Sequence, residues 1–240
     1  MLITKKSITY EIEPGFSIHD TGDYWNLVNA GRWEPETFDI MQKYLSKGYS
    51  YVDIGAWVGP TVLFGAQLAK KCYAIEADPV AYAGLVKNLS LNPGITNVNL
   101  ANVAISSATG FAEIGTKITP GDGMSSLLWS LDAWTVPAFT LKDFFEQNKI
   151  HDCNFIKMDI EGGEFFVLKA CREFFAEFQP TLYLSLHTPW IIDKTGFFSI
   201  INDSLSVYRS IYDPHGKNLS LNDLSDNPGF TTIIATNESV

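Results

Sequence analysis

The chain has 240 residues, of which 46% are hydrophobic and 13% aromatic, enough for one well-filled domain. Its 27 acidic residues outnumber 17 basic ones and give a net charge of −10, which disfavours nucleic acid or an anionic membrane as a partner. We find no apolar run of membrane-spanning length and no signal-peptide pattern. The three cysteines, Cys72, Cys153 and Cys171, form no C-x-x-C pair. We therefore expect a soluble, cytoplasmic protein with reduced, buried thiols.

Strand-like and helix-like segments alternate along most of the sequence. Apolar runs predict strands at 51–54, 72–77, 97–104, 154–158 and 181–186. Helical spacing of apolar residues, with Asp78 and Thr140 as caps, predicts helices at 34–46, 60–70, 79–91, 141–148 and 163–178, and a further helix after Trp190. Two more strands are predicted at 206–212 and 230–236, joined by a polar loop.

This alternation predicts an α/β fold with a doubly wound, mainly parallel sheet of about seven strands and helices on both faces. The last two strands have no helix between them, so we expect them to pair as an antiparallel unit. We interpret residues 1–240 as a single domain in which residues 1–48 form an N-terminal extension and helix packed on the core. In such a sheet, ligands bind beyond the carboxyl ends of the strands, where the strand order reverses.

The segment YVDIGAWVGPTV would lie at that position. Gly55 and Gly59 give the spacing G-x-x-x-G instead of the dinucleotide fingerprint, and Trp57 occupies the position where a pyrophosphate would approach the backbone. The Asp53 carboxylate would repel a pyrophosphate but suits a ligand with positive charge, such as S-adenosylmethionine. Glu76, at the end of the second strand, is placed to accept hydrogen bonds from both ribose hydroxyls. The glycines alone are equally consistent with a tight strand-to-helix turn in any α/β protein.

Several motifs in order resemble those of FkbM-type methyltransferases. These are GRWEPETF, VDIGAWVGPT, AIEADP, NVAIS, FIKMDIEGGEFFVL and YLSLH, which together extend over residues 31–187. The resemblance implies a class I, Rossmann-like methyltransferase fold with S-adenosylmethionine as cofactor. It also implies methyl transfer to a hydroxyl oxygen, often of a sugar or natural product.

The resemblance further implies which residues form the site. The cofactor-binding set is Asp53, Gly55, Trp57, Gly59, Glu76, Ala77, Asn102, Val103, Ala104 and Asp159. Within it, residues 102–104 would form the wall near adenine. The acidic motif after the fourth strand consists of Asp159, Glu161 and Glu164. Three positions depart from the usual pattern: Trp57 replaces asparagine, Pro60 follows the second glycine, and Gly163 replaces alanine. These departures concern the methionine end of the pocket.

A hydroxyl acceptor must lose its proton, and a positioned base assists that loss. The candidate catalytic residues are His187, Asp159 and Glu161, all at predicted strand ends. His187 is our first choice because an unperturbed histidine titrates near neutrality, so the rate would rise through about pH 6–7. A hydrogen-bonded structural histidine and carboxylates at a helix N-terminus, Glu164 above all, are the alternative interpretations. We expect no metal, although three nearby acids suit magnesium if the substrate completes its shell.

The substrate is the least defined part of the sequence. The stretch 117–137, with Met124, Trp129 and Trp134, is interpreted as a lid over the acceptor or as aromatic packing on the sheet, and 23–33 leaves the same two choices. We predict an O-methyltransferase acting on a hydroxyl of a sugar, glycan or small natural product. A nicotinamide-dependent oxidoreductase and a non-catalytic cofactor-binding relative are the alternatives. The sequence leaves the oligomeric state open.

Overall fold

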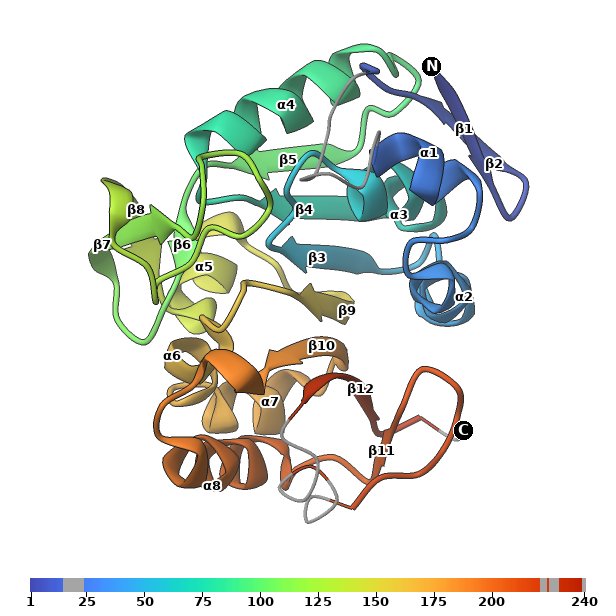
Figure 1. Ribbon diagram of the computed structural model, residues 1–240. Coiled ribbons are helices and arrows are strands. Elements are labelled where there is room, and N and C mark those ends of the chain that lie inside the picture. The colour runs from blue at the N-terminus through green and yellow to red at the C-terminus, as the bar shows by residue number, and fades with distance from the viewer. Residues whose placement is uncertain (15–23, 221–223, 225–228, 239–240) are drawn as a thin grey trace.

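A seven-stranded sheet forms the centre of the computed structural model, which describes residues 1–14, 24–220, 224 and 229–238. Its strand order is β11-β12-β10-β9-β3-β4-β5, and Figure 1 shows the strands from β5 at the top to β11 at the bottom. The strands are β3 (Ser50–Ile54), β4 (Lys71–Ile75), β5 (Val98–Ala101), β9 (Cys153–Met158), β10 (Thr181–His187), β11 (Ser210–Tyr212) and β12 (Phe230–Thr236).

The sheet is parallel from β5 to β10, and β12 runs antiparallel to both of its neighbours. This confirms the predicted mainly parallel sheet with an antiparallel pair at the end of the chain. The order within that end was not predicted, because β12 inserts between β10 and the edge strand β11. β12 pairs with β10 from Leu182 to His187, whereas β11 has only three residues. The longer ladder therefore belongs to the more central position.

Helices cover both faces of the sheet. One face carries α1 (Tyr24–Asn29), α2 (Pro35–Tyr44), α3 (Pro60–Leu68) and α4 (Pro79–Ser90); the other carries α5 (Leu141–Asn148), α6 (Glu164–Leu168), α7 (Arg172–Phe178) and α8 (Lys194–Leu205). Side chains alternate along each strand, so Tyr51 belongs to the first apolar core and Val52 to the second. The predicted caps are confirmed, since Asp78 accepts from two amides of α4 and Thr140 from one of α5.

Two predicted elements are interrupted. The predicted strand 97–104 ends at Ala101, and β6 (Ala104–Ile105) joins a second sheet with β7 (Gly110–Thr116) and β8 (Leu131–Phe139). Figure 1 shows this small sheet on the side toward which β3 points. The predicted helix 163–178 is divided into α6 and α7, because the amides of Ala170 and Cys171 bond three residues back and tighten the chain. The strand predicted at 206–212 is reduced to β11.

The residues before the sheet pack on its first face. An unpredicted hairpin, β1 (Leu2–Lys5) with β2 (Ile8–Glu11), buries Ile3 and Tyr10 in the same core as the α1 residue Trp25. All three cysteines are free and buried, as predicted. None of the helices in the described part of the chain has both the length and the hydrophobicity to cross a bilayer. Within the predicted polar loop before β12, residues 221–223 and 225–228 lie outside the described residues.

Truncation of Phe155 tests the packing of the central sheet. This β9 side chain is 0% exposed and lies between the rings of Tyr44 and Tyr51. We expect Phe155→Ala to lower the free energy of unfolding by about 3–5 kcal/mol, measured by urea denaturation. The control Phe111→Ala removes a β7 side chain that is 79% exposed and should cost at most about 0.5 kcal/mol. Equal losses in the two variants would contradict the described core.

Candidate active site

The loop after β3 is shaped by a very close backbone contact. Gly55 has φ 83°, and a Cβ at this position would lie 1.8 Å from the carbonyl oxygen of Asp159. Trp57 also has a left-handed backbone, with φ 48°. Asparagine, which the resemblance implies at this position, tolerates this conformation better than most residues. The tryptophan adopts the same backbone, and its amide donates to Glu76 Oε2 at 2.7 Å.

Glu76 follows β4 and forms the floor of a first cavity. Its Oε1 accepts from the amide of Asp78 at 2.7 Å, and burial raises the pKa of its carboxyl to about 7. Each carboxylate oxygen keeps a lone pair for another donor. Ala77, Val103 and Ala104 line the same cavity. It therefore offers an apolar wall beside a hydrogen-bond acceptor, the chemistry of a nucleoside site.

Part of the stretch 117–137, predicted as a lid over the acceptor, lines this first cavity. Asp78 Oδ2 accepts from the amide of Gly121 at 2.6 Å and from the hydroxyl of Ser125 at 2.7 Å. Trp57 Nε1 donates to the carbonyl of Gly121 at 3.0 Å. The cavity volume is about 60 Å³, far below the roughly 300 Å³ at which small-molecule pockets begin. We propose that this segment moves when a nucleoside binds.

The end of the predicted lid is a strand. Trp134 lies on β8, packs in the second sheet and donates to the carbonyl of Ala77 at 3.2 Å. Trp129 instead packs edge-on against Trp190 of the short 3-10 helix η1 (Thr188–Trp190), with ring centroids 5.5 Å apart. Of the stretch predicted at 23–33, residue 23 lies outside the described residues, Tyr24 is buried in the core, and Trp33 lines a cavity.

A second cavity of about 430 Å³ adjoins the first. Gly55, Trp57, Gly123, Asp159 and Glu161 line both. Much of the rest of its wall is aromatic or polar and includes Trp33, Glu34, Thr61, Lys157, Ser185, His187, Trp190 and Phe230. Ala56, Pro60, Met124 and Leu186 add apolar surface. The two cavities thus meet at the carboxyl ends of β3 and β9, where the strand order reverses.

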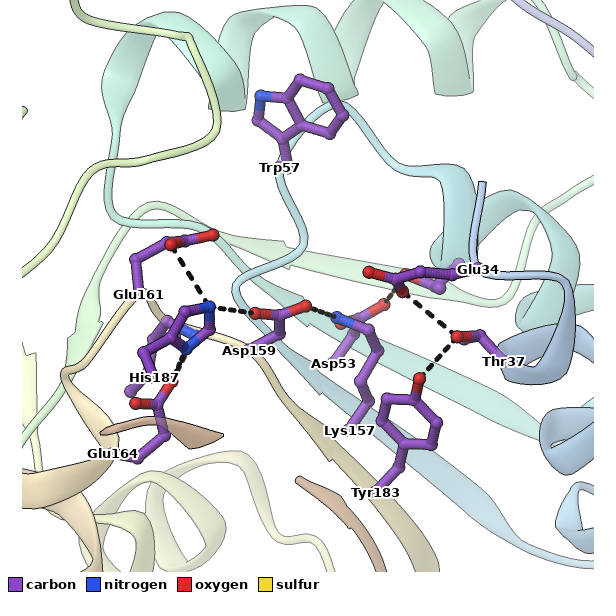
Figure 2. A network of polar contacts seen from close by, with 12 residues as sticks. Glu34, Thr37, Asp53, Trp57, Lys157, Asp159, Glu161, Glu164, Tyr183 and His187 are labelled. Atoms are coloured by element: carbon purple, nitrogen blue, oxygen red, sulfur yellow. Dashed lines mark hydrogen bonds and ion pairs between the residues drawn. The ribbon is translucent and has the colours of Figure 1, made fainter. Parts of the chain in front are cut away.

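A buried lysine organises the charges beneath the second cavity (Figure 2). Lys157 is 3% exposed, and its Nζ lies 3.4 Å from Asp159 Oδ2 and 4.0 Å from Asp53 Oδ1. Asp53 is fully buried and accepts hydrogen bonds from Tyr51 and Thr61, each at 2.6 Å. It lines neither cavity, so we propose that Asp53 acts through its charge and not by direct contact with the cofactor. We did not identify Lys157 as a site residue from the sequence. The signal that could have identified it is a single charged residue inside the apolar run FIKM.

His187 lies among three carboxylates, as Figure 2 shows. Its Nε2 is 3.3 Å from Glu161 and 3.6 Å from Asp159, and its Nδ1 is 3.1 Å from Glu164 Oε1. Burial alone would lower the pKa of His187, but the bond to Glu164 and the charges of all three acids raise it to about 9. The expectation that this histidine titrates near pH 6–7 is therefore corrected upward.

The two remaining candidate bases differ in their protonation. Burial and the neighbouring Asp159 raise the pKa of Glu161 to about 8. Burial would also raise the pKa of Asp159, but Lys157 and His187 hold it below its ordinary value. Asp159 is therefore the ionised member of the group at neutral pH. Asp159, Glu161 and His187 each have one possible ligand atom within 4.8 Å of the other two, a spacing that suits a metal ion. That the site holds no metal stays a prediction.

The other predicted residues contact the protein around the cavities. Glu164 is fully buried at the first position of α6, where a carboxylate is favourable, and accepts from the amide of Ile160, in the turn before the helix, at 3.0 Å. Gly59 has φ 93°, and a Cβ there would lie 2.6 Å from Leu85, so its close approach is to α4. Asn102 donates to the carbonyl of Glu76 at 2.8 Å and connects the ends of β4 and β5. Gly59 and Asn102 line neither cavity.

This strand order, with a ligand site at the reversal point and an antiparallel strand beside β10, defines a class I methyltransferase fold. A model of the methyltransferase FkbM domain matches residues 53–212, well over half of the chain. The protein therefore belongs to the FkbM methyltransferase family, whose methyl donor is S-adenosylmethionine. The predicted family, fold and cofactor are confirmed, and the nicotinamide alternative is set aside.

Solved structures agree with the fold. The FkbM methyltransferase from Methylobacillus flagellatus is 18% identical with a TM-score of 0.50, over 88% of this chain and 52% of that one. The precorrin-6y C5,15-methyltransferase from Geobacter metallireducens is 12% identical with a TM-score of 0.50, over 95% of each chain. The present chain thus spans about half the length of the Methylobacillus protein. No match was found among curated proteins.

Removal of the Glu76 carboxylate tests the cofactor cavity. We propose that its two oxygens accept the ribose hydroxyls, and hydrogen bonds to a charged group contribute about 1.5–3 kcal/mol. Glu76→Ala should therefore weaken binding of S-adenosylhomocysteine at least tenfold in calorimetry, with the fold checked by circular dichroism. Glu113→Ala, on β7, is the control and should bind normally. Unchanged affinity in Glu76→Ala would remove this residue from the site.

Trp57→Asn tests the role of the unusual loop residue. Asparagine accepts the left-handed backbone and keeps the amide bond to Glu76, so cofactor affinity should change little. The indole wall of the second cavity is lost, and because we propose that the acceptor binds there, the acceptor KM should change. Steady-state kinetics for the acceptor, with calorimetry of S-adenosylhomocysteine alongside, measure both effects. A variant with normal acceptor KM and turnover would show that Trp57 is only a packing residue.

Proposed function

We propose that the protein is an S-adenosylmethionine-dependent O-methyltransferase acting on a hydroxyl group of a sugar, glycan or small natural product. The observation that carries this proposal is the wall of the second cavity, which Trp33, Trp190 and Phe230 line together with His187 and Glu161. Aromatic faces suit stacking on a sugar ring or an apolar scaffold. Carboxylates and imidazole suit hydrogen bonds with its hydroxyls.

The residues present fit the cofactor. Glu76 and the apolar wall of the first cavity would hold the adenosine part, and the negative charge around Asp159 favours a sulfonium at the junction of the cavities. When bound, the cofactor supplies a methyl group that is already activated by the sulfonium. The protein then contributes alignment and the exclusion of water. The lid contacts to Asp78 and Trp57 would close the first cavity over the cofactor.

We propose His187 as the base, with Glu161 and Asp159 as its competitors. The bond between Nδ1 and Glu164 fixes the ring, and Nε2 is directed toward Glu161 and Asp159. Trp190 stacks on the imidazole with centroids 4.9 Å apart, which limits its rotation. Asp159 would remain ionised and stabilise positive charge at the reaction centre. The proton accepted from the acceptor hydroxyl would reside on Nε2 beside Glu161.

The charge of the site favours an acceptor without phosphate groups. Glu34, Asp122, Asp159 and Glu161 line the second cavity, whereas the basic residues among its described lining are Lys157 and His187. Together with the net charge of −10, this argues against a nucleic-acid substrate. We also propose a cytoplasmic location, because three free thiols suit a reducing compartment.

A labelled-methyl transfer assay tests the proposed function. Purified protein and S-adenosylmethionine carrying a labelled methyl group are incubated with extracts of sugars, glycans and small natural products. Mass spectrometry of the products should locate the label on a hydroxyl oxygen. Labelling of nitrogen or carbon would overturn the O-methylation proposal. No transfer to any extract, together with normal cofactor binding, would favour a non-catalytic relative.

The pH dependence of methyl transfer distinguishes the candidate bases. A base must be deprotonated, and the pKa of His187 is about 9, so the single-turnover rate should rise with pH toward an alkaline plateau. His187→Gln should lower the plateau by about 100-fold or more. Glu161→Gln should retain activity but shift the profile to lower pH, because the Glu161 charge raises the pKa of His187. Loss of the plateau in Glu161→Gln, with activity kept in His187→Gln, would make Glu161 the base.

A further inference from the structure

Glu34 belongs to the segment GRWEPETF, but it is absent from the site residues that the resemblance implies and has no role in the proposed chemistry. It precedes α2 as its N-cap and lies outside residues 53–212, which the family model matches. Its side chain nevertheless lines the second cavity together with Gly55, Trp57 and Thr61 of the cofactor loop. The N-terminal extension thus contributes a carboxylate to a site built mainly by the sheet.

The position of this carboxylate is fixed from two directions. Glu34 has φ 35°, a left-handed conformation that is costly for a residue of this type, and Pro35 follows it. Its Oε2 accepts a hydrogen bond from Thr37 Oγ1 at 3.1 Å, and that hydroxyl is also 2.6 Å from the Tyr183 hydroxyl of β10. Thr37 and Tyr183 are buried. The side chain is therefore held toward the cavity, with no helix-capping hydrogen bond of its own.

The charges around Glu34 favour a positively charged ligand. Figure 2 shows it reaching in from the side opposite to His187, with Lys157 and Asp159 between them. Lys157 already faces two acids, Asp159 and Asp53. Burial, and next the charge of Asp159, raise the pKa of the Glu34 carboxyl to about 7. A neutral hydroxyl in this part of the cavity would not offset the excess of negative charge, whereas an ammonium group would.

We infer that Glu34 binds the α-ammonium group of the methionine part of the cofactor. The first cavity holds the features that suit adenosine, and the junction at Gly55 and Asp159 leads from it into the second cavity beside Glu34. The methionine part is the portion of the cofactor that extends away from the nucleoside, and it carries the only ammonium. This inference rests on the cofactor and is independent of which acceptor is methylated.

Calorimetry with three ligands tests this inference. S-adenosylhomocysteine carries the ammonium, its deamino analogue keeps the carboxylate but lacks the ammonium, and 5′-methylthioadenosine lacks the whole amino-acid part. Glu34→Gln should weaken S-adenosylhomocysteine about 10- to 100-fold, as expected for a lost charged hydrogen bond. It should leave the other two ligands within about twofold of wild type, because neither has an ammonium to lose. Normal binding of 5′-methylthioadenosine also shows that the variant is folded.

Two further variants sharpen the test. Glu36→Gln changes an acid in the first turn of the same helix that does not line the cavity, so all three affinities should be unchanged. Thr37→Val removes the hydroxyl that orients Glu34 and should produce a smaller loss, again confined to S-adenosylhomocysteine.

Equal losses for all three ligands in Glu34→Gln, or no loss for S-adenosylhomocysteine, would overturn the inference. A raised acceptor KM with unchanged S-adenosylhomocysteine affinity would assign Glu34 to the acceptor and overturn it too. If the wild-type protein bound S-adenosylhomocysteine but methylated no hydroxyl, only the proposed O-methylation would fail. A wild-type protein that bound none of the three ligands would contradict the cofactor itself and this inference with it.

Discussion

The close contact between Gly55 and the carbonyl of Asp159 is the constraint on which the rest of the site depends. β3 and β9 are parallel neighbours, and the Asp159 amide donates to the carbonyl of Ile54 at 3.0 Å where both strands end. Any side chain at position 55 would overlap the Asp159 backbone. The backbone turns away from the sheet directly after β3 and directly after β9. The amide of Trp57 therefore reaches Glu76, and the Asp159 side chain faces the cavities. One backbone contact therefore positions both ends of the proposed cofactor site.

The second constraint is the buried charge of Lys157. An isolated ammonium in the interior is very costly, and here Asp53 and Asp159 offset it. The pair with Lys157 keeps Asp159 ionised, so Asp159 is poorly suited to take up a proton at neutral pH. Glu161 and His187 face the same cavity but bind their protons up to about pH 8 and 9. The sequence alone made these three residues comparable candidates for the base, and their electrostatic surroundings give them different pKa values.

The sequence predicted the central strands and the edge of the sheet that carries the site, because buried parallel strands are continuous apolar runs. Elements stabilised by tertiary contacts were not predictable: the β1–β2 hairpin depends on burial of Ile3 and Tyr10, and β8 contains Pro137 and follows a Gly- and Ser-rich stretch. Local sequence patterns also did not predict which way the Asp53 side chain points. With a period of two, its side chain shares the face of Tyr51, which α3 covers, so it meets Thr61 instead of the cavity.

The backbone and the ring of Trp57 contact different parts of the site. Its backbone amide contacts Glu76, and its indole contacts the lid at Gly121 and the ring of Tyr24, 4.5 Å away between centroids. A smaller side chain on this loop would keep the first contact and lose the other two. The left-handed backbone at position 57 thus shapes the loop after β3, whereas the ring connects that loop to Gly121 and Tyr24. We propose that the backbone of this residue serves the first cavity through Glu76 and that its ring shapes the second.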